Sequence, residues 1–222
     1  MKYITKFTNH TAYTAAESGL TLPNVSLCVQ ENEVHYNPYV DPYGGHEYVD
    51  LGLPSGTLWA TMNVGATSVT DYGNYYQYGK GADTYQVTSG QSDYSGTENP
   101  LASSADTATV EWGGDWHMPT QGQLNELTAN TTFEMVENYQ GSGIKGATFT
   151  ANEQTLFIPY SGIYNDGALY NRSQVCYIWS STPDGRYYAY YLYLANNHRS
   201  VGNNVRVFGY SVRPVIGDII IN

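Results

Sequence analysis

The stretch between residues 177 and 215 constrains the fold more than any other part of the chain. Its ends, residues 178–181 and 209–214, bracket a run of Tyr, Asn, Gly, Arg, His and Ser. Inside it, Tyr191-Leu192-Tyr193-Leu194 alternates polar-tipped and apolar residues, which predicts a strand with the leucines inward and the tyrosines outward. Tyr, Ser, Gly and Asn also dominate antibody-like binding surfaces. The pattern therefore predicts a β-rich scaffold that displays a binding face.

Composition supports a mainly β protein. The chain has 222 residues, enough for one large domain or for one domain with a small appendage. Only 13% of the residues are charged, whereas Tyr and Gly each number 23. Aromatic residues with a polar tip suit half-buried positions on sheets. We predict an α+β protein of mostly irregular antiparallel β structure, with one or two short helices and long loops.

The negative net charge of the chain disfavours two classes of partner. The net charge is −11, which disfavours binding to nucleic-acid backbones or to anionic membrane surfaces. It is unevenly spread, at −13 for residues 1–174 and +2 for residues 175–222. This distribution fits either an acidic body with a mildly basic display face or arginines scattered over the surface without a role.

The chain offers few signals of export or of bound groups. No apolar run approaches the roughly 20 residues that span a membrane, and residues 2–6 lack the apolar core of a signal peptide. We therefore expect no membrane insertion and no export by that route. Cys28 and Cys176 are distant and have no metal-ligand spacing, so we expect buried reduced thiols and no cofactor or metal.

The pattern of residues 1–46 predicts a small β/α module for assembly or attachment. Residues 2–7, 25–29 and 34–36 are strand-like, and a short helix fits between Asn9 or Thr11 and Gly19. Residues 38–45 are rich in Pro and Gly and form the best linker candidate. A module this small buries little surface alone. We expect it to pack on the main domain, on a copy of itself or in a larger assembly.

Residues 47–222 are predicted to form the main domain. Residues 48–51 and 57–63 predict a hairpin, and residues 147–150 and 155–159 predict another across Asn152-Glu153. Thr120 and Gln123 form a capping box for the clearest helix, which fades by Asn130. Residues 209–215 should form the last strand and pair near the start of this domain.

Six segments in the main domain resemble one family. EYVDLGLPSGTLWATMNVGA, YGNYYQYGK, WGGDWHMPTQGQLNEL, LFIPYSG, YIWSSTP and GYSVRPV occur in the order of the "major paralogous domain" proteins of gut bacteria. That domain is related to the formylglycine-generating-enzyme branch of the C-type lectin fold. The resemblance covers about residues 47–216 and implies a C-type lectin-like fold. It also implies scaffold roles, which fall on Trp59, Trp116, Trp179, Leu192, Leu194 and Arg213.

The tyrosine-rich stretch, about residues 177–215, resembles the variable regions of diversity-generating retroelements. In those systems a reverse transcriptase mutates template adenines, and Asn codons ending in a pyrimidine cannot become Lys, Glu, Gln, Met or Trp. Residues 184–208 contain none of these five types, whereas residues 1–174 contain 30. Chance would leave such a window empty about once in a hundred times on composition alone. A tyrosine-rich strand with its loops could also avoid these residues for structural reasons.

The resemblance assigns the remaining roles by position. Ala189, Tyr190 and Arg206 fall on scaffold positions. The ligand-binding, variable positions are Gly185, Arg186, Tyr187, Tyr188, Tyr191, Tyr193, Ala195, Asn197, His198, Arg199, Ser200, Val205, Val207 and Phe208.

Other candidate sites have weaker support. A metal site built from Asp71, Asp83, Asp93 and Asp106 has no spacing to favour it, and we expect these to be solvated loop acids. His117 has no acid or nucleophile in a motif with it, so we expect no acid–base role. The tripeptides Glu-Pro-Asn and Gln-Pro-Asp of sugar-binding lectins do not occur, which disfavours calcium-dependent sugar binding.

We therefore expect a binding protein without enzymatic activity. The favoured role is a retroelement-diversified receptor-binding protein in a phage tail, which recognises a bacterial surface protein or glycan. It is similar in fold and role to phage major tropism determinants, which suggests a homo-oligomer such as a trimer. The alternatives are a bacterial cell-surface or pilus-tip adhesin with a fixed face and an enzyme of the formylglycine-generating type. The enzyme needs a reactive cysteine pair, and Cys176 has no neighbouring cysteine.

Overall fold

A computed structural model describes residues 27–30, 33–36, 45–81 and 94–218, with only the backbone of the first two segments. The chain divides into two compact units, Met1–Tyr48 and Val49–Asn222. In the first unit, strands β1 (Leu27–Gln30) and β2 (Glu33–Tyr36) pair antiparallel, with Leu27 opposite Tyr36. The predicted strand at residues 2–7, the predicted helix before Gly19 and nearly all of the predicted linker lie outside the described residues.

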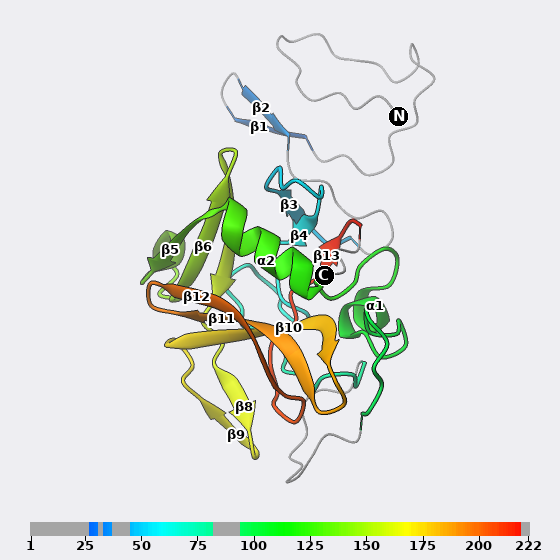
Figure 1. Ribbon diagram of the computed structural model, residues 1–222. Helices are drawn as coiled ribbons and strands as arrows, with labels where there is room; N and C mark the ends of the chain where they lie inside the picture. Colours follow the sequence, from blue (N-terminus) through cyan, green and yellow to red (C-terminus); the bar gives the residue numbers. More distant parts are fainter. Residues whose placement is uncertain (1–26, 31–32, 37–44, 82–93, 219–222) are drawn as a thin grey trace, which may run out of the picture. The chain divides into compact units, whose positions relative to one another are not determined.

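The second unit is built from small antiparallel sheets (Figure 1). Strands β10, β11 and β12 form the sheet that carries the tyrosine-rich stretch, in that spatial order. The other sheets have the orders β13-β4-β3, β5-β6-β7 and β8-β9. Both predicted hairpins, β3 with β4 and β6 with β7, are confirmed, as is the mostly antiparallel β architecture. The strands are β3 (Tyr48–Asp50), β4 (Leu58–Ala60), β5 (Thr132–Val136), β6 (Gly146–Ala151), β7 (Gln154–Pro159), β8 (Ile163–Asn165), β9 (Ala168–Tyr170), β10 (Val175–Asp184), β11 (Tyr188–Ala195), β12 (His198–Val205) and β13 (Val215–Ile216).

In the described part of the chain, two short α-helices accompany the sheets. The predicted helix is α2 (Gln121–Asn130), and its capping box is complete: the Thr120 hydroxyl accepts from the Gln123 amide, and the Gln123 side chain accepts from the Thr120 amide. Helix α1 (Thr107–Trp112) was not predicted, and Asp106 caps its N-terminus. A short 3-10 turn follows at Tyr139–Gly141. No helix among the described residues is long and apolar enough to cross a membrane.

The β10–β11–β12 sheet contributes to two hydrophobic clusters. Leu192, Leu194 and Ile178 join a first core cluster, which also holds Leu124 and Leu127 of α2. Alternate residues on the same strands, including Trp179 and Ala189, join a second cluster. Because successive side chains of a strand point to opposite faces, β10 and β11 each supply both clusters. The prediction that Leu192 and Leu194 point inward is confirmed, since both are fully buried.

The two anchors that bracket the tyrosine-rich stretch have clear structural roles. At the first, the pairing of β10 with β11 is interrupted between Trp179 and Pro183, where Ser180 donates to the carbonyl of Tyr190. The hydroxyl of Thr182 accepts from the amide of Gln121 and so fixes the start of α2. The second anchor leads into β13, which pairs with β4, so the predicted pairing with the start of the domain is confirmed. The predicted strand at residues 209–215 is shorter than expected, because regular pairing is confined to Val215–Ile216 and residues 209–211 form only isolated bridges.

Candidate ligand-binding face

The predicted ligand-binding residues fall at three places along the β10–β11–β12 sheet. Seven residue steps separate the two ends of β11, Tyr188 and Ala195, a span of about 24 Å. One group lies around the β10–β11 turn, one on the middle of β11 and β12, and one around the β11–β12 turn. In that order the groups are Gly185, Arg186, Tyr187, Tyr188, Val205 and Val207; Tyr191, Tyr193 and Ser200, with Phe208 beside them; and Ala195, Asn197, His198 and Arg199.

The middle of the face is an aromatic platform, defined by Tyr177, Tyr191, Tyr193, Phe208 and Tyr210. Tyr177 lies opposite Tyr193 on neighbouring strands, with ring centroids 5.0 Å apart. Tyr191 lies 5.5 Å from Tyr177 and 5.4 Å from Tyr210. The rings of Phe208 and Tyr210 are stacked, 5.9 Å apart. Such contacts stiffen a surface, because each ring is supported by its neighbours.

The platform is less exposed than the alternation predicted. Tyr191 and Tyr193 are half-buried, and Tyr191 packs against the second core cluster. It lies 6.3 Å from Trp179, edge to face. The two tyrosines thus point away from the first cluster: Tyr191 packs at the edge of the second cluster, and Tyr193 packs against Tyr177.

Burial sets the electrostatics of the platform. Desolvation raises the pKa of Tyr177 to about 12, and the neighbouring Tyr193 and Tyr191 add to the rise. Desolvation likewise raises the pKa of Tyr191 and of Tyr210, although the hydrogen bond from Asn204 to the Tyr210 hydroxyl opposes the shift. Tyr177, Tyr191 and Tyr210 are therefore neutral at ordinary pH, and the platform combines hydroxyl groups with aromatic carbon.

The β10–β11 turn carries the most exposed aromatic residues of the face. Tyr187 and Tyr188 are 52% and 45% exposed, and Arg186 lies over the Tyr187 ring at 5.7 Å. Gly185 has a φ of 62°, a left-handed conformation that suits glycine. Tyr188 pairs with Val205, so the segment after β12 lies beside this turn.

At the opposite end of β11, the side chains around the β11–β12 turn lie on different faces of the sheet. His198 is exposed and lies 6.0 Å from the Tyr193 ring, and Asn197 is exposed in the β11–β12 turn. Arg199 pairs with Leu194 and therefore shares its face. Its Nε and Nη2 donate to the carbonyl of Thr128 in α2, at 3.1 and 3.0 Å. In this structure Arg199 braces the helix and is not brought together with the platform, contrary to its assignment to the displayed face.

Eight of the nine predicted scaffold residues are buried, and Tyr190 is half-buried. The eight are Trp59, Trp116, Trp179, Ala189, Leu192, Leu194, Arg206 and Arg213. Trp179 donates from its indole nitrogen to the carbonyl of Tyr76, and Arg213 donates from Nη1 to the carbonyl of Ala60. The sheet thus sits on a packed base, which Tyr191 and Phe208 of the display face also contact.

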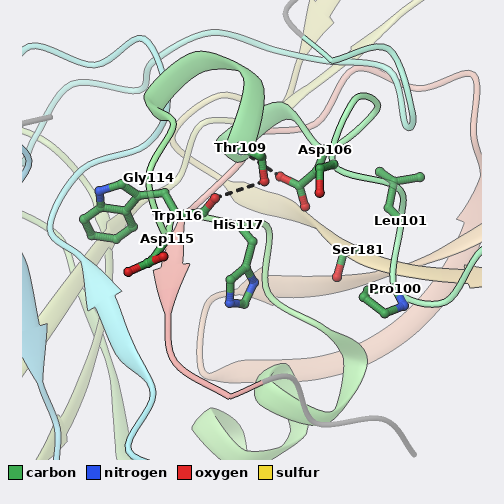
Figure 2. Close-up of a pocket in the computed structure, with 10 residues that line it drawn as sticks. Pro100, Leu101, Asp106, Thr109, Gly114, Asp115, Trp116, His117 and Ser181 are labelled. Atoms are coloured by element: carbon green, nitrogen blue, oxygen red, sulfur yellow. Dashed lines mark hydrogen bonds between the residues drawn. The ribbon is translucent and has the colours of Figure 1, made fainter. Parts of the chain in front are cut away.

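A small cavity lies near α1, and none of the predicted ligand-binding residues lines it (Figure 2). Asp106 and His117 reach its wall, together with Ser181 and the exposed Asp115. Asp106 is 2% exposed and accepts from the amides of Thr109 and Met118, so the expectation of a solvated loop acid is wrong for this residue. Both ring nitrogens of His117 lie against main-chain carbonyls, of Met118 at 2.9 Å and of Gly217 at 3.2 Å.

The structure does not bring Asp71, another acid of the candidate metal site, together with Asp106. Asp71 accepts from the amides of Thr67 and Gly73 in its own loop. Asp83 and Asp93 lie outside the described residues. Within the part of the chain that the structure describes, no group of three His, Cys, Asp or Glu side chains is placed to hold a metal ion.

Two platform residues were missed from the sequence. Tyr210 belongs to the second anchor and Tyr177 directly precedes the first, so the sequence pattern places both in the frame and not on the face. The period of 2 in Tyr177-Ile178-Trp179 was a usable signal, because it places Tyr177 and Trp179 on the face opposite Ile178.

Comparison with known proteins adds no assignment. No protein-family model matches the sequence, and neither the curated proteins nor the solved structures give a match. The function of this face is therefore inferred from its sequence pattern and its geometry.

Proposed function

We propose that this protein is a non-enzymatic display protein that binds a ligand through the β10–β11–β12 face. Retroelement mutagenesis of adenines diversifies that face. Its place is the tail of a phage, where it binds a protein or glycan on the bacterial surface. In this proposal the domain has a C-type lectin-like fold and functions as a homo-oligomer.

One observation carries the proposal: the exposed residues of the variable stretch are separated from the residues that hold the sheet. Leu192 and Leu194 in β11 are fully buried, whereas Tyr187 in the β10–β11 turn, Tyr188 at the start of β11 and His198 at the start of β12 are exposed. Substitutions at exposed positions away from caps, turns and networks usually change stability by less than about 0.5 kcal/mol. Such a face can change its sequence while the core stays intact.

The chemistry of the face suits binding. Tyrosine combines a large apolar ring with a hydroxyl group at low entropic cost, and exposed clusters of it mark interaction surfaces. The only cysteine with a described side chain, Cys176, is buried, and its thiol lies 3.4 Å from the Ser161 hydroxyl. Burial raises the pKa of this thiol, which disfavours the reactive thiolate. These features favour binding over chemistry of the formylglycine-generating type.

The decisive experiment is a survey of the gene in its natural population. Codons 184–208 should vary between cells, and only where a nearby repeat carries adenines. Codons 132–159, which encode the β5–β7 sheet, provide the matched control in the same reads and should be invariant. Equal variation in the two windows, or an invariant stretch with no repeat and no reverse transcriptase nearby, would contradict the proposal.

The location is tested separately. Mass spectrometry of purified particles should find the protein in the phage tail fraction. Its recovery from the bacterial surface instead, with an export signal or lipobox upstream of codon 1, would support the alternative of an adhesin.

A further inference from the structure

Arg206 is the most extensively bonded side chain near the display face. It follows β12 and is 1% exposed. Its Nη2 donates to the carbonyl of Gly185 at 2.7 Å, and its Nε donates to the carbonyl of Tyr188 at 3.0 Å. Its main-chain amide donates to the carbonyl of Tyr187 at 3.1 Å. One residue therefore holds three main-chain carbonyls of the β10–β11 turn.

The other side of the same guanidinium is fixed to the body of the domain. Nη1 donates to the carbonyl of Gly96 at 2.8 Å. The guanidinium carbon lies 4.8 Å from the centroid of the Tyr78 ring and 5.6 Å from that of Tyr94. Carbonyl oxygens and ring faces together compensate the cost of burying this cation. All three partners lie far from the variable stretch in sequence.

We propose that Arg206 is the positioning residue of the β10–β11 turn, and that it holds the turn in one main-chain conformation whatever side chains occupy positions 186–188. Every bond from Arg206 to the turn ends on a main-chain oxygen, which all amino acids provide. We call this set of hydrogen bonds from Arg206 the clamp. The side chains of Arg186, Tyr187 and Tyr188 point to solvent or to one another and take no part in it. The significance for ligand binding rests on the proposed function, whereas the clamp itself does not.

Arginine is suited to this task in a way that lysine is not. The planar guanidinium carries five N–H donors in a fixed fork, so it can bond two segments at once in set directions. A lysine ammonium is a single point on a flexible stem. The conservative replacement Arg206→Lys should therefore keep the charge and lose the clamp.

The first test is hydrogen exchange at residues 184–188 in Arg206→Lys and Arg206→Met. We expect these amides to exchange roughly tenfold faster or more than in the wild type, without denaturant and at a pH where the rest of the sheet stays protected. The matched control is Arg199→Met, which removes two bonds to the carbonyl of Thr128 and should leave exchange at the turn unchanged. Unchanged exchange in the Arg206 variants, or equal acceleration in Arg199→Met, would overturn the proposal.

A second test keeps Arg206 and changes the turn. In the triple variant R186S/Y187S/Y188S, the clamp should persist, so exchange at residues 184–188, corrected for intrinsic rates, should stay within about twofold of wild type. The Nε–H resonance of Arg206 should keep its position in NMR spectra. A resonance shifted to the solvent-exposed range would overturn the proposal. This variant decides the matter if Arg206→Met does not fold.

Neither measurement uses a ligand. Failure of the clamp would therefore leave the receptor-binding proposal standing. Failure of the codon survey would remove that function and leave the clamp as a property of the fold.

Discussion

The rings of Tyr177 and Tyr210 are stacked, with their centroids 4.7 Å apart and their planes 23° apart. Tyr177 also touches the rings of Tyr191 and Tyr193. Tyr210 in turn lies 4.1 Å from the buried Trp179. The predicted variable tyrosines are thus connected to the second core cluster through two tyrosines that lie outside the predicted variable set.

Removal of the Tyr177 ring should loosen this connection. Truncation of a fully buried aromatic residue costs about 3–5 kcal/mol, and Tyr177 is only half-buried, so Tyr177→Ala should lower the free energy of unfolding by about 2 kcal/mol. Tyr177→Phe keeps the ring and should cost less than about 0.5 kcal/mol. Urea titrations measure both values. Equal losses in the two variants would assign the effect to the hydroxyl group and contradict the stacking argument.

Alkaline pH should destabilise the protein through the same residue. The pKa of Tyr177 rises from its ordinary value of 10.0 to about 12 in the folded protein, chiefly by desolvation. The unfolded chain therefore loses the proton first. The contribution of Tyr177 is fully present below pH 10 and is lost as the pH rises toward 12.

Urea titrations between about pH 8 and about pH 11.5 should show this fall, and it should be smaller in Tyr177→Phe. Other buried tyrosines, such as Tyr78 and Tyr160, have raised pKa values for the same reason and contribute a fall that the variant retains. An identical pH dependence in the variant and the wild type would show that Tyr177 does not titrate as stated.

Elements that are marked by a short sequence pattern, such as α2 and β11, could be predicted from the sequence. The capping box of Thr120 and Gln123 marks the start of α2, and the alternation in residues 191–194 marks β11. Helix α1 has only six residues in a polar region, and its one strong signal is the cap at Asp106. So short a helix depends on packing rather than on its own periodicity, which explains why it was missed.

The face assigned to each side chain depends on register, which no single strand reveals. The two-residue turn at Asn196 and Asn197 sets Leu194 opposite Arg199. A shift by one residue would send Arg199 to the platform and Ser200 to the helix. The sequence predicts β11 correctly as a strand. It does not predict which residues of β12 lie on the same face as the tyrosines.

Gly185 should tolerate only some of the residues that diversification supplies. Its φ of 62° strains residues with a Cβ atom, although no heavy atom lies within 4 Å of the position a Cβ would take. Gly185→Val should therefore lower the free energy of unfolding by about 1–2 kcal/mol, whereas Gly185→Asn should cost less than about 1 kcal/mol. Denaturant titrations compare the two. Equal stability of both variants would show that the turn relaxes and that the left-handed conformation is not required.

Asp106 should be the most sensitive acid among those near the cavity in Figure 2. Its carboxylate caps α1 through the amide of Thr109 and also accepts from the buried amide of Met118. Asp106→Ala removes the cap and leaves a buried amide unpaired, so it should lower the free energy of unfolding by about 3 kcal/mol. Asp106→Asn retains one acceptor oxygen and removes a buried charge, and should cost about 1 kcal/mol.

Asp115 provides the matched control for this prediction, because it lines the same cavity but is exposed. Asp115→Ala should change the free energy of unfolding by less than about 0.5 kcal/mol. Thermal and urea unfolding of the three variants give the comparison. If Asp106→Ala and Asp115→Ala were equally stable, the capping bonds of Asp106 would contribute nothing beyond a surface charge. Helix α1 would then be held by its other contacts, which include the packing of the fully buried Ala108 and the hydrogen bond from the Thr107 hydroxyl to the carbonyl of Gly81.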